Sequence, residues 1–223
     1  MQKFHIFITN KTTFTAMKLV NIFLAGVLML VATSCDCKCN KNNEGENAVI
    51  ETIMARRSIR QYKPEAVDRE VMAQIVECGI NAPNGQNKQS WEVRIVDNPE
   101  LLAQMGEAMA AAHPKMDAEM VKGMFRGAPT MAFIARDLHY DFSTIDCGLL
   151  AENMILSAWS LGVGSICLGG PVRFLTDNEL CKPLVERLGF SDHYELCLCV
   201  GFGYADEQPE AKPRKAEKVK YVE

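Results

Sequence analysis

Residues 144–161 form a long apolar helical pattern, and this segment limits the folds that the chain can adopt. Leu149, Leu150, Met154 and Trp159 place large apolar side chains on most faces of the expected helix. A helix that is apolar all round must be buried, either in the core of a domain or between two subunits. The sequence therefore predicts that this helix lies at the centre of a packed domain or of a subunit interface.

The rest of the folded part alternates helical patterns with short apolar strands. Spacing of apolar residues separates the two kinds of segment. We expect helices over residues 48–57, 65–81, 99–112, 115–126 and 144–161, and strands over residues 91–96, 130–135, 165–168 and 195–202. Thr176 and Glu179 have capping-box spacing, which predicts one more helix from 176 to 188. Helices mixed with a few short strands indicate an α+β fold with a central sheet.

Two short segments, near the two ends of the folded part, concentrate positive charge. They are Arg56-Arg57-Ser58-Ile59-Arg60 and Lys212-Pro213-Arg214-Lys215. The whole chain is acidic, with a formal net charge of −4, so these clusters are local exceptions. An acidic balance argues against a nucleic-acid partner, because neutralisation of phosphates dominates that kind of binding. Guanidinium groups and a serine hydroxyl suit a small phosphate-bearing ligand, although a solvated charge run is the plainer interpretation.

Two further segments carry groups that could contact a heterocycle. The loop from Pro83 to Trp91 is rich in amides, including Asn84 and Asn87, and ordinary turn chemistry explains it equally well. The segment Leu168-Gly169-Gly170 follows an expected strand, and glycines allow the backbone to approach a ligand closely. The Gly-x-Gly-x-x-Gly pattern of a Rossmann dinucleotide site does not follow any expected strand.

In their order along the chain, these segments resemble the nitroreductase family of FMN-dependent oxidoreductases. The matches are an Arg-x-Ser-x-Arg segment, a Pro-Asn-Gly-Gln-Asn-x-Gln loop, a Leu-Gly-Gly strand end, and Gly-Tyr followed by Lys-x-Arg. The resemblance implies these cofactor-binding residues: Arg56, Arg57, Ser58, Arg60, Pro83, Asn84, Gly85, Asn87, Leu168, Gly169, Gly170, Lys212 and Arg214. The basic residues would hold the FMN phosphate.

The resemblance also implies a fold and a reaction. The fold would be nitroreductase-like, with a mixed or antiparallel central sheet flanked by helices, in an intertwined homodimer that shares two FMN sites. The reaction would be a ping-pong hydride transfer from NAD(P)H through the flavin to a nitroaromatic, a quinone or a similar small-molecule acceptor. The flavin would carry the chemistry, so we expect no catalytic side chain.

The N-terminal segment has the features of a bacterial lipoprotein signal. Lys3, Lys11 and Lys18 precede an apolar run from Leu19 to Ala32, which is too short for a comfortable membrane span. Small residues then lead into Cys35, the expected site of lipidation. We therefore expect a signal peptide over 1–34, a flexible tether over 35–47 and the FMN-binding domain over 48–223, with an uncleaved N-terminal anchor as the alternative.

This N-terminal segment predicts a lipid-anchored protein of the bacterial cell envelope, or a cytoplasmic one if the segment is not a signal. An exported protein would meet little NAD(P)H. An alternative function is therefore a lipid-anchored flavin-binding redox module that uses a non-nicotinamide donor, such as a quinol or a partner protein.

Cysteines and histidines do not form a recognisable site in the sequence. Cys37 and Cys39 could bind a metal, but no second ligand pair has a familiar spacing, so we expect no metal. The cysteines in apolar surroundings are expected to be buried and without a functional disulfide: Cys78, Cys147, Cys167, Cys197 and Cys199. We expect no nucleophilic catalysis by Cys147, because no histidine partner for it is apparent; the candidates lie in loop-like or strand-edge sequence, and none makes a recognisable pair: His113, His139 and His193. Asp146 is expected to cap the apolar helix.

Overall fold

The computed structural model describes residues 47–223 of the chain. The expected signal peptide, Cys35, Cys37, Cys39 and all of the expected tether except Asn47 lie outside the described residues. The α-helices are α2 (Ala48–Ala55), α3 (Arg69–Ile80), α4 (Pro99–Ala112), α5 (Ala118–Lys122), α6 (Ser143–Ser160), α7 (Gly170–Thr176) and α8 (Lys182–Glu186). Three short 3-10 helices are η1 (Gly85–Asn87), η2 (Gly123–Phe125) and η3 (Ala216–Lys218).

Four strands form one antiparallel sheet. They are β1 (Trp91–Val96), β2 (Thr130–Asp137), β3 (Gly164–Leu168) and β4 (Tyr194–Gly203). Their order across the sheet is β1-β2-β4-β3, and each pair of neighbours is antiparallel. The expected α+β class is confirmed, with an antiparallel central sheet.

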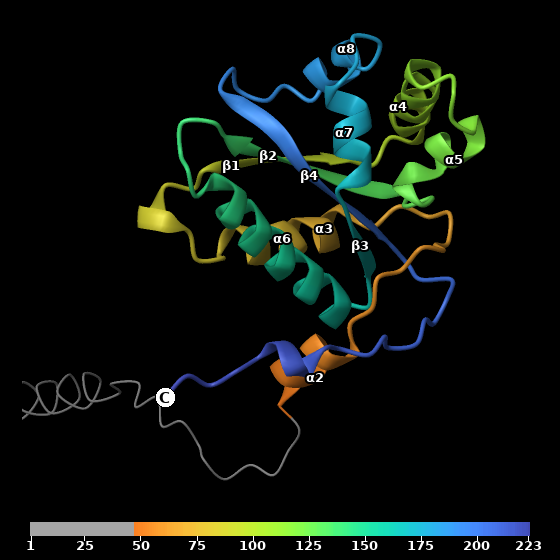
Figure 1. Ribbon diagram of the computed structural model, residues 1–223. Helices are drawn as coiled ribbons and strands as arrows, with labels where there is room; N and C mark the ends of the chain where they lie inside the picture. The colour runs from red at the N-terminus through yellow and green to blue at the C-terminus, as the bar shows by residue number, and fades with distance from the viewer. Residues whose placement is uncertain (1–46) are drawn as a thin grey trace, which may run out of the picture. The chain divides into compact units, whose positions relative to one another are not determined.

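Helices cover both faces of this sheet, and the strand sequence explains why. In β2, Met131 and Phe133 belong to one buried apolar cluster, whereas Ala132 and Ile134 belong to a second. Successive side chains of a strand point to opposite faces, so an unbroken apolar run requires cover on both sides. In Figure 1, α3 and α6 lie on one face, and α4, α5 and α7 lie on the other.

Helix α6 is buried along one side only. Leu150, Met154 and Ala158 are fully buried against α3 and the sheet. On the other side, Ile145 and Leu149 are 58% and 40% exposed. The core therefore accounts for only part of the apolar surface that the sequence places on this helix.

The element boundaries differ from the expectations at several places. Helix α2 ends at Ala55, so Arg56 and Arg57 follow it, and η2 replaces the end of the helix expected over 115–126. The helix expected from Thr176 to Leu188 is wrong, because Thr176 ends α7. The Asn178 side chain instead accepts a hydrogen bond from the backbone of Leu180 and forms a turn before α8. Within residues 47–223, no helix combines the length and apolarity needed to cross a membrane.

Candidate functional site

The segment Arg56–Arg60 is held against β3 at the edge of the sheet. The side chain of Asn47 caps the start of α2, and the helix ends just before Arg56. Ser58 then forms a parallel bridge with Ser165, and the Ile59 amide donates to the Ser165 carbonyl at 3.0 Å. Because the Ile59 side chain is only 1% exposed, it anchors the segment and leaves its neighbours at the surface.

The chain returns to this segment after β4. The Lys63 amide donates to the Tyr204 carbonyl at 2.9 Å, and Tyr62 bridges Ala205 in antiparallel fashion. Burial raises the pKa of Tyr62 far above its usual range, so the phenol stays protonated and donates to the Ile59 carbonyl at 2.8 Å. These contacts align the C-terminal segment with the Arg56–Arg60 segment.

Glu207 secures the returning chain at the basic segment. Its Oε1 accepts hydrogen bonds from the backbone amides of Arg60 and Gln61, the latter at 3.2 Å. The Asp206 amide donates to the Gln61 carbonyl at 2.9 Å. Sequence reasoning missed Glu207, because a glutamate in a charged tail has no distinctive local pattern.

The two basic segments share one small pocket of about 110 Å³. Its lining contains five cationic side chains and one carboxylate: Arg56, Arg57, Arg60, Lys212, Arg214 and Glu210. Ser58 and Pro209 complete it. In Figure 1 the C-terminal segment passes the end of α2. The structure thus brings together all the basic residues that the sequence predicts at the phosphate end.

The cationic side chains differ in the hydrogen bonds that they make within the chain. Arg57 turns back on the end of α2, where its Nη1 donates to the carbonyls of Met54 and Arg56 at 2.7 and 2.8 Å. The Arg60 and Arg214 guanidinium groups each donate one hydrogen bond to a nearby carbonyl. Within residues 47–223, the side chains of Arg56 and Lys212 make no hydrogen bond or ion pair, which leaves both free to bind an anion.

A second pocket of about 320 Å³ adjoins the first, because Arg60 lines both. It contains the predicted strand end, Leu168, Gly169 and Gly170. A Cβ atom built on either glycine would meet no atom within 4 Å. This geometry leaves the backbone open to a flat ligand on that side.

The second pocket also contains residues that sequence reasoning missed. Met124 lies in η2 and Arg126 directly follows it, and both line this pocket with the glycines. Arg126 has a left-handed backbone, with φ of 59°, and Gly127 follows with φ of 67°. Two successive left-handed residues turn the chain from η2 into β2, and a glycine after a helical pattern was the only signal of this turn.

The loop that contains Pro83, Asn84, Gly85 and Asn87 lies elsewhere. The Gly85 amide and the Ser90 hydroxyl donate to the carboxylate of Asp146, at 3.0 and 2.6 Å. Asp146 belongs to the first turn of α6, whereas Ser165 follows the end of that helix. An 18-residue helix is about 27 Å long, so the loop is far from the basic pocket of the same chain.

One side-chain expectation needs correction here. Asp146 is not the N-cap of α6; the cap position is Phe142, and Asp146 holds the 83–90 loop instead. The rings of His139 and His193 stack with centroids 4.9 Å apart, a contact that sequence reasoning missed.

The cysteines of the described part are all free thiols. Cys147 and Cys199 are buried, as expected, but Cys167 is exposed and lines the glycine pocket. An interaction with Cys197 and burial together raise the pKa of the Cys147 thiol. A thiol with a raised pKa stays protonated at neutral pH, so it does not supply a thiolate.

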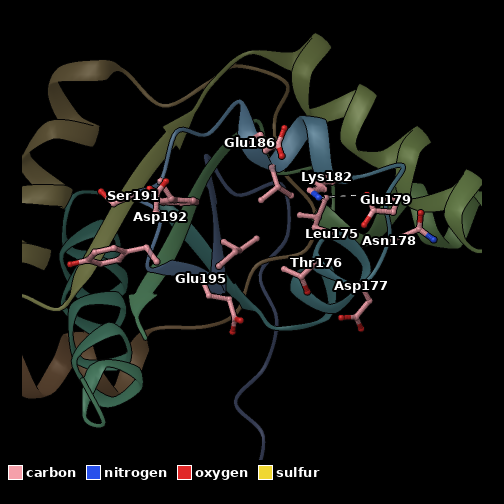
Figure 2. Close-up of a pocket in the computed structure, with 14 residues that line it drawn as sticks. Leu175, Thr176, Asp177, Asn178, Glu179, Lys182, Glu186, Ser191, Asp192 and Glu195 are labelled. Atoms are coloured by element: carbon pink, nitrogen blue, oxygen red, sulfur yellow. Dashed lines mark ion pairs between the residues drawn. The ribbon is translucent and has the colours of Figure 1, made fainter. Parts of the chain in front are cut away.

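A larger cavity of about 740 Å³ lies between α7, α8 and β4. Figure 2 shows that acidic side chains surround it; they are Asp177, Glu179, Glu186, Asp192 and Glu195. Lys182 is the only cationic residue of its lining, and it lies 3.7 Å from Glu179. This negative lining repels phosphates, and it contains none of the residues predicted for the site.

The fold and its pockets define a class of protein: an α+β domain with an arginine-rich pocket beside an open glycine-lined pocket. The family pattern described as the nitroreductase family matches residues 53–204. This chain belongs to the nitroreductase family.

Relatives of known sequence agree with this assignment. The chain is 30% identical over 199 residues to nitroreductase NfnB of Mycolicibacterium smegmatis, which covers 70% of this chain and 82% of that protein. It is 27% identical over 175 residues to the NADPH-flavin oxidoreductase of Vibrio harveyi, which covers 75% of this chain and 70% of that protein.

Solved structures share the fold as well. A nitroreductase with bound FMN from Desulfitobacterium hafniense DCB-2 is 31% identical, with a TM-score of 0.72. A second, also with bound FMN, from Bacteroides fragilis NCTC 9343, is 27% identical with a TM-score of 0.72. Each alignment covers 80% of this chain and 100% of the other. The expected nitroreductase-like fold is confirmed.

Proposed function

We propose that this chain is an FMN-dependent oxidoreductase that takes its electrons from NAD(P)H. Membership of the nitroreductase family makes it an oxidoreductase with FMN as its cofactor. When bound, FMN supplies the redox chemistry, passing hydride in a ping-pong cycle from NAD(P)H to a nitroaromatic, a quinone or a similar small-molecule acceptor. The protein supplies binding, orientation and the local electrostatics.

One observation carries this proposal: the predicted basic residues from both ends of the domain meet in a single pocket that adjoins the open glycines. A phosphate in the first pocket would receive charge-assisted hydrogen bonds from Arg56, Lys212 and Arg214. The flat ring system would then extend past Arg60 towards Gly169 and Gly170. We assign Arg57 a smaller part in cofactor binding, because its guanidinium already caps α2.

We also propose that two copies of the chain form a homodimer. Helix α2 exposes four large apolar side chains, Val49, Ile50, Ile53 and Met54, each at least 49% exposed. Helix α2 contacts α6, which exposes two further large apolar side chains, Ile145 and Leu149. Several exposed apolar side chains on neighbouring helices are typical of an interaction site.

The dimer would also bring the 83–90 loop to a flavin. Since this loop and the basic pocket lie at opposite ends of α6, the loop and the pocket of one chain cannot both contact the same flavin. A second copy that packs on the exposed side of α6 can supply the loop. Sedimentation velocity of the wild type and of Ile53→Asp tests this assembly: a dimer is expected for the wild type, and a monomer for the variant.

Export and lipidation at Cys35 remain part of the proposal on the strength of the N-terminal sequence alone. Such a location favours the second candidate function, a lipid-anchored flavin-binding redox module that receives electrons from a quinol or a partner protein. This candidate keeps the same flavin site and replaces only the donor.

The first experiment is an absorption spectrum of the purified protein, followed by release and identification of any yellow cofactor. Stoichiometric FMN supports the site. Steady-state oxidation of NADH and NADPH with menadione or nitrofurazone then separates the two candidates. A protein that stays colourless with added FMN contradicts both. Bound FMN that dithionite reduces, but that neither nicotinamide reduces, favours the second candidate.

A further inference from the structure

Three potential metal ligands gather at the end of the sheet that lies away from the basic pocket. Asp137 is the last residue of β2, His139 follows it, and His193 comes just before β4. One ligand atom from each side chain lies within 4.8 Å of the others. Ser165 pairs with Phe202 at the opposite end of β4, so this cluster is separate from the proposed flavin site.

The backbone holds the three residues in place. Asp137 pairs with Tyr194 in the register of β2 and β4, and the Leu138 amide donates to the His193 carbonyl at 2.9 Å. The Asp137 Oδ1 accepts a hydrogen bond from the His139 amide at 2.8 Å. The ring planes of His139 and His193 are within 8° of parallel. The cluster is therefore set by sheet pairing and a tight turn.

Apart from the hydrogen bond from the His139 amide to Asp137, the three ligand side chains have no hydrogen-bond or ion-pair partner in the part of the chain that the structure describes. There, no cationic side chain pairs with Asp137, and neither imidazole makes a hydrogen bond. The neighbouring Arg136 is directed to Glu195 at 3.1 Å, on the other face of the strand. Exposed Asp141 and Asp192 flank the cluster in sequence and add negative charge. The surroundings thus favour a cation.

We propose that Asp137, His139 and His193 bind a divalent transition-metal cation of the zinc class. Imidazole nitrogens select borderline metals such as Zn²⁺ over Mg²⁺ and Ca²⁺, which prefer oxygen ligands. Three protein ligands leave a further coordination position for water. Zn–N bonds of about 2.0–2.1 Å require the ligand atoms to move closer together. The exposed His139 side chain can make this movement by rotation about its side-chain bonds.

A bound cation would tie the start of β4 to the segment that follows β2. That segment carries Tyr140, whose ring lies 5.4 Å from the Nζ of Lys88. Because the unfolded chain does not hold these three ligands together, binding would stabilise the folded state. The site would thus brace the surface beside the 83–90 loop, away from the flavin pockets of the same chain.

Titration calorimetry of the chelator-treated full chain with zinc chloride tests the proposal. We expect one zinc per chain at this site. His139→Ala and His193→Ala should each weaken zinc binding roughly tenfold or more, the size of effect found for changes at metal sites. Glu70→Gln is the matched control, since it removes an exposed carboxylate in the first turn of α3, away from the cluster, and its zinc affinity should equal that of the wild type.

Two further measurements identify the ligands. The variant Cys37→Ser/Cys39→Ser should still bind zinc, which would exclude these cysteines as the ligands. Cu²⁺ bound to the same variant should show two equatorial nitrogen ligands in its electron paramagnetic resonance spectrum. Equal melting temperatures without zinc would establish that the histidine variants are folded. The proposal is overturned if the double variant His139→Ala/His193→Ala binds zinc like the wild type, or if binding disappears only in the cysteine variant. It is equally overturned if the wild type binds no zinc.

Discussion

The hydroxyl of Ser90 donates a hydrogen bond of 2.6 Å to Asp146, and both residues are buried. The other oxygen of the same carboxylate accepts from the amide of Gly85 at 3.0 Å. A carboxylate in the first turn of α6 therefore holds the 83–90 loop at both Gly85 and Ser90. The dipole of α6 favours negative charge at this position.

Replacement of Asp146 by alanine should loosen this loop. The change leaves the Ser90 hydroxyl and the Gly85 amide without their acceptor, which should cost about 1–3 kcal/mol of unfolding free energy. Chemical denaturation measures this cost, and limited proteolysis should show faster cleavage within 84–90. Asp141→Ala, at an exposed carboxylate five residues earlier, should change neither quantity. Equal stability of Asp146→Ala and the wild type would contradict the assigned role.

Removal of single basic side chains should weaken FMN binding to different extents. Arg56→Ala and Arg214→Ala should each cost about 1.5–3 kcal/mol, because each loses a charge-assisted hydrogen bond to the phosphate. Fluorescence titration of the FMN-free protein measures the dissociation constant. Arg187→Ala, an exposed change just after α8, should bind FMN like the wild type. Unchanged affinity in both site variants would refute the assignment of the phosphate pocket.

Arg57→Ala should behave differently from its neighbours. The Arg57 guanidinium donates to the carbonyls of Met54 and Arg56, so its loss should destabilise the end of α2 more than it weakens FMN binding. We expect a loss of affinity smaller than that of Arg56→Ala, and faster amide hydrogen exchange in α2. A loss of affinity equal to that of Arg56→Ala would show that Arg57 turns to the phosphate.

Glu207 should hold the C-terminal segment on the basic segment. In Glu207→Ala the amides of Arg60 and Gln61 lose their acceptor, so their hydrogen exchange should accelerate. Glu207→Gln keeps an oxygen acceptor and removes only the charge, which makes it the control and should preserve most of the protection. Identical exchange in all three proteins would mean that the contact does not order this segment.

The ion pair between Arg69 and Asp97 should make a small part of the stability depend on pH. The hydrogen bond from Arg69 lowers the pKa of Asp97 in the folded state. The contribution is therefore present above the unfolded value of about 3.9 and is lost as the pH falls through the lower folded value. Denaturation should show Arg69→Ala less stable than the wild type at pH 7, with a difference that shrinks in acid. Arg173→Ala should show no such trend.

Lipidation at Cys35 predicts where the protein is found in a bacterial host. Cys35→Ala should move the chain from the membrane fraction to the soluble fraction, because the acyl chains that hold it would be absent. Immunoblots of fractionated cells measure this partition, with Cys39→Ala as the matched control. A Cys35→Ala protein that still sediments with membranes would argue for an uncleaved N-terminal anchor.

Periodicity of apolar residues was enough to locate most elements of the sheet. The strands at Trp91–Val96 and Thr130–Asp137 agree with the expected segments to within two residues. The capping-box pattern at Thr176 gave a wrong helix start, because a helix already begins near Pro171 and Asn178 forms a turn after it. Two local patterns thus predicted different structures for the same residues, and the packed structure adopts one of them.

The sequence indicated some residues of the candidate site, and others were found only in the structure. Residue types and their order along the chain singled out Arg56, Ser58, Arg60, Lys212 and Arg214, because clustered charge in an acidic chain is visible locally, and all five line one pocket. The sequence did not indicate Arg126 or Glu207. Arg126 belongs to a backbone turn, and Glu207 binds amides that are distant in the sequence.

By itself, the sequence determined the fold class, the family and the chemical character of the two basic segments. The fold class and the charge of the segments depend on composition and spacing, which are local properties of a chain, and the family depends on the resemblance of its motifs. Only the tertiary structure decided that the two segments share one pocket, that Asp146 anchors the 83–90 loop, and that Asp137, His139 and His193 converge. Such contacts arise from strand register and chain reversal over long sequence separations, which local patterns do not encode.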